Sequence, residues 1–177
     1  QLIDEFQDTS LLQWKNLIPL LDNAISSTNS SILLVGDVKQ SIYRWRGGYP
    51  EQFIDLTKGI TPFSIDPEVI RLTKNYRSQD TIVKTNNTFF KESADVLSSP
   101  DYQNLFKKGA NQETNNNPGG AVTFTFVEGF TIEEREPNYL EAIIQQLIDC
   151  ENRKYKRNEI CILVRTRQQG VLITEYL

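Results

Sequence analysis

The chain has 177 residues, of which 38% are hydrophobic and 24% are charged, and its formal net charge at pH 7 is −4. This balance excludes a disordered chain, which has too few apolar residues to bury. Histidine is absent and cysteine occurs only at Cys150 and Cys161, which excludes a zinc site on the usual Cys/His ligands and any histidine-based triad. The two cysteines are far from any CxxC spacing, so we expect them to be reduced core residues of a cytoplasmic protein. No apolar run approaches the roughly 20 residues of a membrane span. Methionine is also absent, and we expect the chain to be part of a longer protein.

The first third of the chain predicts a β-α-β unit. Leu2 and Ile3 lead into two carboxylates as a buried strand would, and Thr9 or Ser10 can cap a helix over residues 11–25, in which Pro19 should produce a kink or a restart. A polar loop at 26–31 precedes an apolar run at 32–35, which is typical of a parallel strand covered on both faces. Ligands of such sheets bind at the carboxyl ends of the strands, where Asp4, Glu5 and Asp37 would stand.

The rest of the chain also predicts α/β structure. Ser78 can cap a helix that runs to about residue 90, and residues 109–120 form the clearest loop. Residues 121–129 alternate as a strand with Val122, Phe124 and Phe126 on one face, residues 138–151 have helical spacing, and residues 160–164 read as another buried strand.

The acidic doublet Asp4-Glu5 suits a nucleoside triphosphatase. An aspartate at a strand end can hold Mg²⁺, usually through water, and an adjacent glutamate can orient and deprotonate the attacking water. The alternative is a solvated acidic turn, which so short a pattern does not exclude.

The stretch VGDVKQSIYRWRGG, residues 35–48, adds groups that suit phosphates and bases. Gln40 can contact a γ-phosphate or the attacking water, and the rings of Tyr43 and Trp45 can stack on unpaired bases while Lys39, Arg44 and Arg46 face phosphates. The alternative is that the two rings fill a core while the arginines reach solvent. In LTKNYRS, residues 72–78, Arg77 can reach a nucleotide across a lobe junction and Tyr76 can lie on a purine, or both can simply begin a helix.

Together DEFQDTS, VGDVKQSIYRWRGG and NYRS, in this order, resemble motifs II, III and IV of the UvrD/Rep-like superfamily 1 DNA helicases. The later ICILVRTRQQGVLITEYL resembles motif IVa, and Val38-Lys39 within GDVKQ is closer to the RecB/AddA helicase–nuclease branch. The resemblance implies parts of two RecA-like lobes with parallel sheets flanked by helices: residues 1–74 from the first lobe and 75–177 from the second.

The resemblance also implies roles for individual residues. Asp4, with Glu5 beside it, would bind Mg²⁺, and Glu5 would be the catalytic base. Gln40 would sense the γ-phosphate of ATP, Arg77 would contact it from the lobe junction, and Tyr76 would stack on adenine. The DNA contacts would be Tyr43, Trp45 and Arg46; Arg44 stands where UvrD and Rep have glycine and receives no role.

The implied function is a part of an ATP-dependent helicase or translocase acting on single- and double-stranded DNA, with no membrane and with a possible nuclease domain or partner subunit. The chain lacks the loop GxxxxGK[ST], so we expect these residues alone to be inactive as an ATPase. The alternatives are a non-catalytic nucleic-acid-binding or assembly module and, last, an unrelated phosphohydrolase. An exposed sheet edge would also allow self-association.

Overall fold

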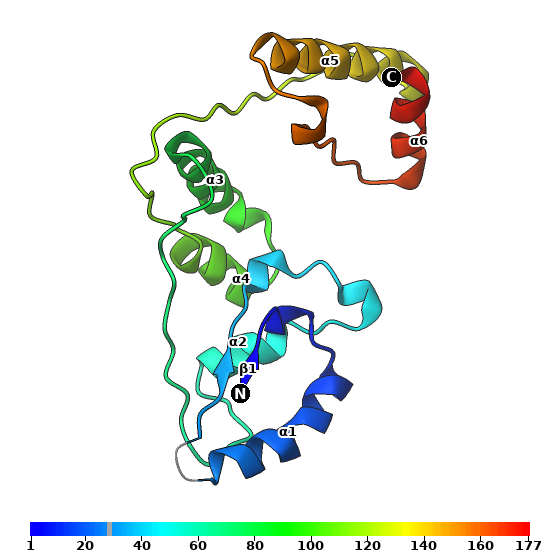
Figure 1. Ribbon diagram of the computed structural model, residues 1–177. Helices are drawn as coiled ribbons and strands as arrows, with labels where there is room; N and C mark the ends of the chain where they lie inside the picture. Colours follow the sequence, from blue (N-terminus) through cyan, green and yellow to red (C-terminus); the bar gives the residue numbers. More distant parts are fainter. Residues whose placement is uncertain (28–29) are drawn as a thin grey trace. The chain divides into compact units, whose positions relative to one another are not determined.

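The computed structural model describes residues 1–27 and 30–177, which form two compact units, Gln1–Val122 and Thr123–Leu177 (Figure 1). Positions 28 and 29 of the predicted loop 26–31 lie outside the described residues. Within the described ranges, no helix is both long enough and apolar enough to cross a membrane. The helices and strands in chain order are β1 (Leu2–Ile3), α1 (Leu11–Ile25), β2 (Leu33–Leu34), α2 (Glu51–Thr57), α3 (Asp80–Ser93), α4 (Pro100–Asn104), α5 (Ile132–Asn152) and α6 (Arg167–Tyr176).

The predicted β-α-β unit is confirmed. Strands β1 and β2 pair in parallel, with Leu2 opposite Leu33 and Ile3 opposite Leu34. Helix α1 connects them and starts at Ser10, whose hydroxyl accepts a 3.2 Å hydrogen bond from the Gln13 N–H while Gln13 Oε1 accepts one of 2.9 Å from the Ser10 N–H. This reciprocal capping box satisfies two of the free N–H groups at the helix start.

Two details of this unit differ from the sequence prediction. Pro19 does not restart α1, because the helix is continuous and buries Trp14 and Leu21 on either side of the proline, so that packing holds it together. The predicted kink stays a prediction. The sheet is not covered on both faces: Leu2 and Leu33 are 66% and 56% exposed, since only the opposite face packs on the core.

The core of the first unit lies between the sheet, α1 and α2, which are neighbours in Figure 1. Its centre is Phe6, which is fully buried and meets Trp14 and Phe53 edge to face, with ring centroids 4.8 Å and 5.4 Å apart. Leu21 and Leu56 complete the cluster. Phe6 directly follows the acidic doublet, so this packing fixes the end of β1 where the candidate site begins.

Helix α3 forms where a helix is predicted, but Ser78 is not its cap. The helix begins at Asp80 after Gln79, without a side-chain cap. The loop 109–120 takes over this function: the N–H groups of Asp80 and Thr81 donate to the carbonyls of Asn117 and Gly119, at 2.8 Å and 3.1 Å. A long-range contact therefore replaces the local cap that the sequence predicts.

The second unit contains α5 and α6 and, in the described residues, no strand. The strand predictions at 121–129 and 160–164 are thus wrong, although both segments line one cavity of about 590 Å³ against α5. Alternation is present at 121–129, but it places Thr123, Thr125 and Val127 on the cavity and leaves Phe126 92% exposed. The physical reason is that alternation reports burial, whereas a strand also needs a hydrogen-bonded neighbour, and these segments form no ladder. Helix α5 starts earlier than predicted, at a capping box of Thr131 and Glu134.

Candidate functional site

The two carboxylates of the acidic doublet lie exposed at the carboxyl end of β1, as predicted. Glu5 adopts a left-handed backbone conformation, with φ 51° and ψ 40°, and its N–H donates a 2.9 Å hydrogen bond to Asp4 Oδ1. Such a conformation is uncommon for a residue with a side chain and costs on the order of 1 kcal/mol. It turns the chain sharply out of the sheet, so that consecutive carboxylates stand at one edge.

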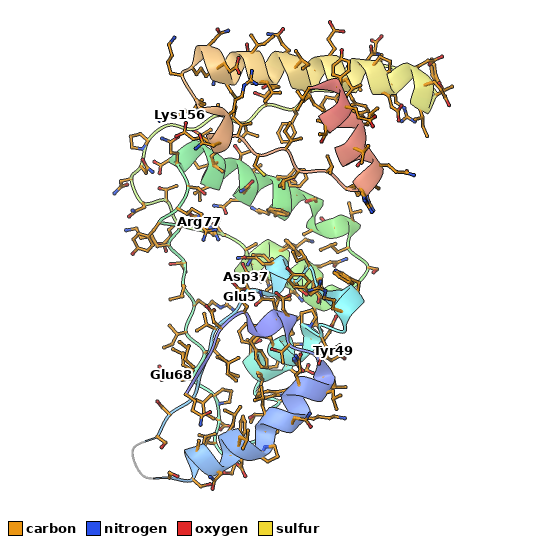
Figure 2. The ribbon with its side chains drawn as sticks, turned by 45° about the vertical axis from the view of Figure 1, so that its right-hand side comes forward. Glu5, Asp37, Tyr49, Glu68, Arg77 and Lys156 are labelled. Carbon is orange, nitrogen blue, oxygen red and sulfur yellow. The ribbon has the colours of Figure 1, made fainter. Side chains whose placement is uncertain are left out.

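Gln7 connects this edge to the neighbouring strand. Its side chain is 1% exposed; Nε2 donates to Glu5 Oε2 at 2.6 Å, and Oε1 accepts the Asp37 N–H at 3.0 Å. Because a backbone N–H can only donate, the amide oxygen must face Asp37 and the amide nitrogen must face Glu5. Figure 2 shows Glu5 and Asp37 close together. Gln7 was missed at the sequence level; its only signal there is a polar residue beside the core position Phe6.

Gly36 makes the close approach of the two strand ends possible. A Cβ at this position would stand 2.5 Å from Gln7 Oε1, 3.1 Å from Phe53 Cε1 and 3.2 Å from the Phe6 backbone nitrogen. Any side chain here would displace the glutamine from its two partners. The Gly-Asp pair that ends β2 therefore has a packing reason as well as a chemical one.

Asp37 organises the turn that follows β2. Its Oδ1 accepts hydrogen bonds from the Lys39 ammonium at 2.6 Å and the Lys39 N–H at 3.0 Å, and its Oδ2 accepts one from Gln40 Nε2 at 3.0 Å. Burial raises the pKa of Asp37, but the hydrogen bonds from Lys39 and Gln40 outweigh it and hold the pKa below the ordinary value. Gln40 is exposed and uses one of its two amide hydrogens here, which leaves the other for a ligand.

The aromatic pair a few residues further on is on the surface. Trp45 is 72% exposed and Tyr43 37%, so neither ring fills the core. Their centroids are 6.4 Å apart, and the Arg46 guanidinium carbon lies 4.4 Å from the Trp45 ring and 5.4 Å from the Tyr43 ring. The turn Arg44–Arg46 closes on Gly47, whose φ of 88° favours glycine. The result is an exposed surface of two rings and one cation.

Tyr76 and Arg77 lie on a different segment of the first unit. Residues 73–75 pair with Glu113, and Asn75 Oδ1 accepts the N–H groups of Arg77 and Ser78 at 2.9 Å and 2.8 Å. The Tyr76 ring is exposed, with the Lys74 ammonium 5.9 Å from its centroid. No contact joins this segment to Glu5 in the described part of the chain, and Figure 2 shows Arg77 apart from Glu5 and Asp37. Convergence of these groups on one nucleotide stays a prediction.

The donor set at the end of β1 fits Mg²⁺. This ion prefers oxygen ligands and is usually held by one or two carboxylates together with waters and phosphates. The N–H of Glu5 occupies only Oδ1 of Asp4, and Gln7 binds only Oε2 of Glu5, so each exposed carboxylate retains an oxygen for an ion or its water. In residues 1–27 and 30–177, no cluster of three or more acidic, cysteine or histidine side chains surrounds a metal position.

Two family models match the chain. Residues 1–61 match the UvrD/REP helicase N-terminal domain, and residues 70–177 match the UvrD-like helicase C-terminal domain. The first match contains the acidic edge and the aromatic pair, and the second contains Tyr76 and Arg77.

Curated relatives agree with this assignment. The chain is 37% identical over 92 residues to an ATP-dependent helicase/nuclease subunit of Bacillus pumilus, which covers 51% of the chain and 7% of that protein. It is 30% identical over 182 aligned positions to "ATP-dependent DNA helicase Rep" of Buchnera aphidicola, which covers 99% of the chain and 23% of the relative. It is 28% identical over 176 aligned positions to "DNA helicase II" of Haemophilus influenzae, and the alignment covers 99% of the chain and 20% of the relative. The chain thus spans less than a quarter of the length of these relatives. With both domain models matched along it, the chain belongs to the UvrD-like helicase family.

Proposed function

We propose that this chain is part of an ATP-dependent DNA helicase that couples Mg²⁺-ATP hydrolysis to movement on single-stranded DNA. One observation carries the proposal: a continuous set of hydrogen bonds runs from Glu5 through Gln7 to Asp37 and Gln40, and the exposed aromatic pair begins three residues later. The groups suited to hydrolysis and those suited to base stacking therefore share one short, tightly packed segment. The relatives, which are named as helicases, support the same interpretation.

Each residue of the acidic edge has a defined task in this proposal. Asp4 and Glu5 would hold the Mg²⁺ ion and its water, and the bound ion would neutralise charge on the phosphates. Glu5 accepts the proton of the attacking water through the carboxylate oxygen that Gln7 leaves open. Gln7 fixes the rotamer of Glu5, because its buried amide cannot turn without losing the Asp37 N–H.

The link to DNA starts at Gln40. In the structure one amide hydrogen of Gln40 donates to Asp37, and the other would donate to a γ-phosphate oxygen. A phosphate that draws the Gln40 side chain toward itself would strain the bond to Asp37 and shift the turn that leads into Tyr43 and Trp45. Bases would stack on the two rings, and Arg46 would contact the phosphate backbone.

The remaining features complete the proposal. Arg77 would stabilise transition-state charge on the phosphates and Tyr76 would stack on adenine, within two RecA-like lobes that meet near residues 74 and 75. We also propose that the intact protein translocates on DNA together with a nuclease domain or partner subunit in the cytoplasm, in agreement with the helicase/nuclease relatives. Because the edge of the small sheet is open, self-association is also proposed, and light scattering that finds a monomer would contradict it.

The test uses the intact protein and the substitution Glu5→Gln, which keeps size and hydrogen bonding but removes the base. DNA-stimulated ATP hydrolysis should fall by roughly 10²- to 10⁴-fold, the usual contribution of a general base, while ATP binding measured with a fluorescent analogue persists. Asp8→Asn, which changes a carboxylate of the same segment outside the proposed machinery, is the matched control. Hydrolysis that survives in Glu5→Gln would refute the assignment of Glu5 as the base. An intact protein that binds DNA but hydrolyses no ATP would instead favour the non-catalytic module.

A further inference from the structure

Arg44 has a separate set of contacts from its neighbours in the aromatic segment. Whereas Arg46 lies over the rings of Tyr43 and Trp45, the Arg44 Nη2 donates to both Glu51 Oε1 and the Tyr102 hydroxyl. The Tyr102 hydroxyl itself donates to Glu51 Oε1 at 3.1 Å, and the Arg44 guanidinium carbon lies 5.7 Å from the Tyr102 ring centroid. These contacts form a closed triangle in which one guanidinium holds two elements. Arg44 therefore directs its Nη2 to Glu51 and Tyr102, whereas Arg46 lies over the aromatic rings.

The triangle joins parts of the chain that are distant in sequence. Glu51 begins α2, and Tyr102 lies in α4. A second ion pair connects the same two helices, from the Lys58 ammonium after α2 to Asp101 Oδ1 in α4, at 2.8 Å. Residues 44, 51 and 58 fall within the N-terminal family match, whereas residues 101 and 102 fall within the C-terminal one. These contacts thus cross from one family domain to the other inside a single compact unit.

The three groups of the triangle also interact electrostatically. Burial raises the pKa of Glu51, but the hydrogen bonds from Arg44, the backbone and Tyr102, together with the Arg44 charge, outweigh it and hold the pKa below its ordinary value. Burial also raises the pKa of the Tyr102 hydroxyl, and the Glu51 charge raises it further. Arg44 is half exposed, so the ion pair alone is weak and its geometry matters more than its strength.

We propose that Arg44 and Tyr102 are positioning residues for single-stranded DNA binding, and that Arg44 is not itself a phosphate contact. The triangle fixes the turn Arg44–Arg46 against α4, so that the rings of Tyr43 and Trp45 are held in one orientation before DNA arrives. A preorganised surface binds more tightly because less freedom is lost on binding. Tyr102, which belongs to the other family domain, therefore influences DNA affinity, and the position of α4 is coupled to the aromatic surface.

This inference rests on the proposed DNA contact of Tyr43 and Trp45, so the test must distinguish failure of the positioning role from failure of that contact. The intact protein is compared with Arg44→Gln, Tyr102→Phe and the double variant, using anisotropy of a labelled oligothymidine at several salt concentrations. Each single change should weaken binding about 3- to 10-fold, and the double variant should be no weaker than the worse single variant, because both break one triangle. The slope of log affinity against log salt should stay unchanged, since no phosphate contact is lost. Melting temperatures should stay close to the wild type, because the Arg44 side chain is half exposed and such ion pairs contribute little to stability.

Two controls complete the experiment. Asp95→Asn breaks an exposed ion pair of a similar kind, with Lys107, and should leave affinity unchanged. Trp45→Ala tests the proposed DNA surface itself. The inference is overturned if Trp45→Ala weakens binding, Tyr102→Phe does not, and Arg44→Gln lowers the salt slope by about 0.7, which is the loss expected for one phosphate contact to single-stranded DNA. In that case Arg44 contacts phosphate, and the proposed function still stands. If Trp45→Ala has no effect, the DNA surface is wrong and the inference falls with it.

Discussion

The packing of Gln7 against Gly36 leads to a quantitative prediction about stability. In Gly36→Ala the new Cβ would stand 2.5 Å from Gln7 Oε1, far inside contact distance, with Phe53 and the Phe6 backbone nitrogen close behind. The glutamine must therefore move and lose its bonds to Glu5 and Asp37. Overpacking costs about 1–3 kcal/mol, and each lost hydrogen bond costs about 1 kcal/mol. With two bonds lost, we expect the free energy of unfolding to fall by roughly 3–5 kcal/mol.

The assay is urea unfolding followed by tryptophan fluorescence, in which the buried Trp14 reports on the core next to the site. A double-mutant cycle isolates the contact: in a Gln7→Ala background the same Gly36→Ala change should cost about 1–2 kcal/mol less, because the clashing oxygen is gone. Gly109→Ala is the matched control, since its Cβ would meet only Leu105 Cδ1 at 3.4 Å. Additive costs in the cycle, or a Gly36→Ala variant as stable as the wild type, would refute the reasoning.

Three further predictions follow from exposure, charge and composition. Trp45→Ala should weaken single-strand binding roughly 5- to 150-fold, the equivalent of about 1–3 kcal/mol of stacking, and should leave stability unchanged. Trp14→Ala should instead lower the free energy of unfolding by about 3–5 kcal/mol. Anisotropy measures the DNA affinity and urea unfolding measures the stability, and the reverse pattern would contradict the assignment. Because the folded-state pKa of Asp37 is lowered, its contribution to stability is present above the unfolded value near 3.8 and is lost as the pH falls through the lower folded value. The stability difference between wild type and Asp37→Asn, from urea midpoints, should be constant from about pH 7 to pH 5 and shrink below about pH 4; a difference that grows on acidification would show the opposite sign. These 177 residues alone should hydrolyse no ATP above background in a magnesium-dependent assay, and turnover abolished by Glu5→Gln would show that a GxxxxGK[ST] loop is dispensable.

Local signals predicted the start of the fold well. Apolar spacing and the Ser10 cap were enough for β1, α1 and β2, because these depend on neighbours within a few residues or on one short parallel pairing. The acidic edge followed from the rule that parallel strands end together. What the sequence could not supply were contacts between distant residues, such as the bond from the Asp37 N–H to Gln7, or the loop carbonyls that replace Ser78 as the cap of α3.

In the second unit, local sequence signals predicted strands that do not form. The apolar alternation at 121–129 and the apolar run at 160–164 carry strong strand signals, yet neither segment forms a ladder. Periodicity records which side chains turn inward, and pairing depends on a partner backbone that no pattern within a single segment specifies. The inward face also consists of Thr123, Thr125 and Val127 rather than the phenylalanines, which hydrophobicity alone would have placed inside.

The left-handed backbone at Glu5 carries a conformational cost that the contact with Gln7 offsets. Glycine adopts φ 51° without steric penalty, but Glu5→Gly would leave the buried Gln7 Nε2 without its acceptor, so a library screened only for heat resistance should favour neither residue strongly. The proposed chemistry, rather than folding, would then decide which residue this codon encodes.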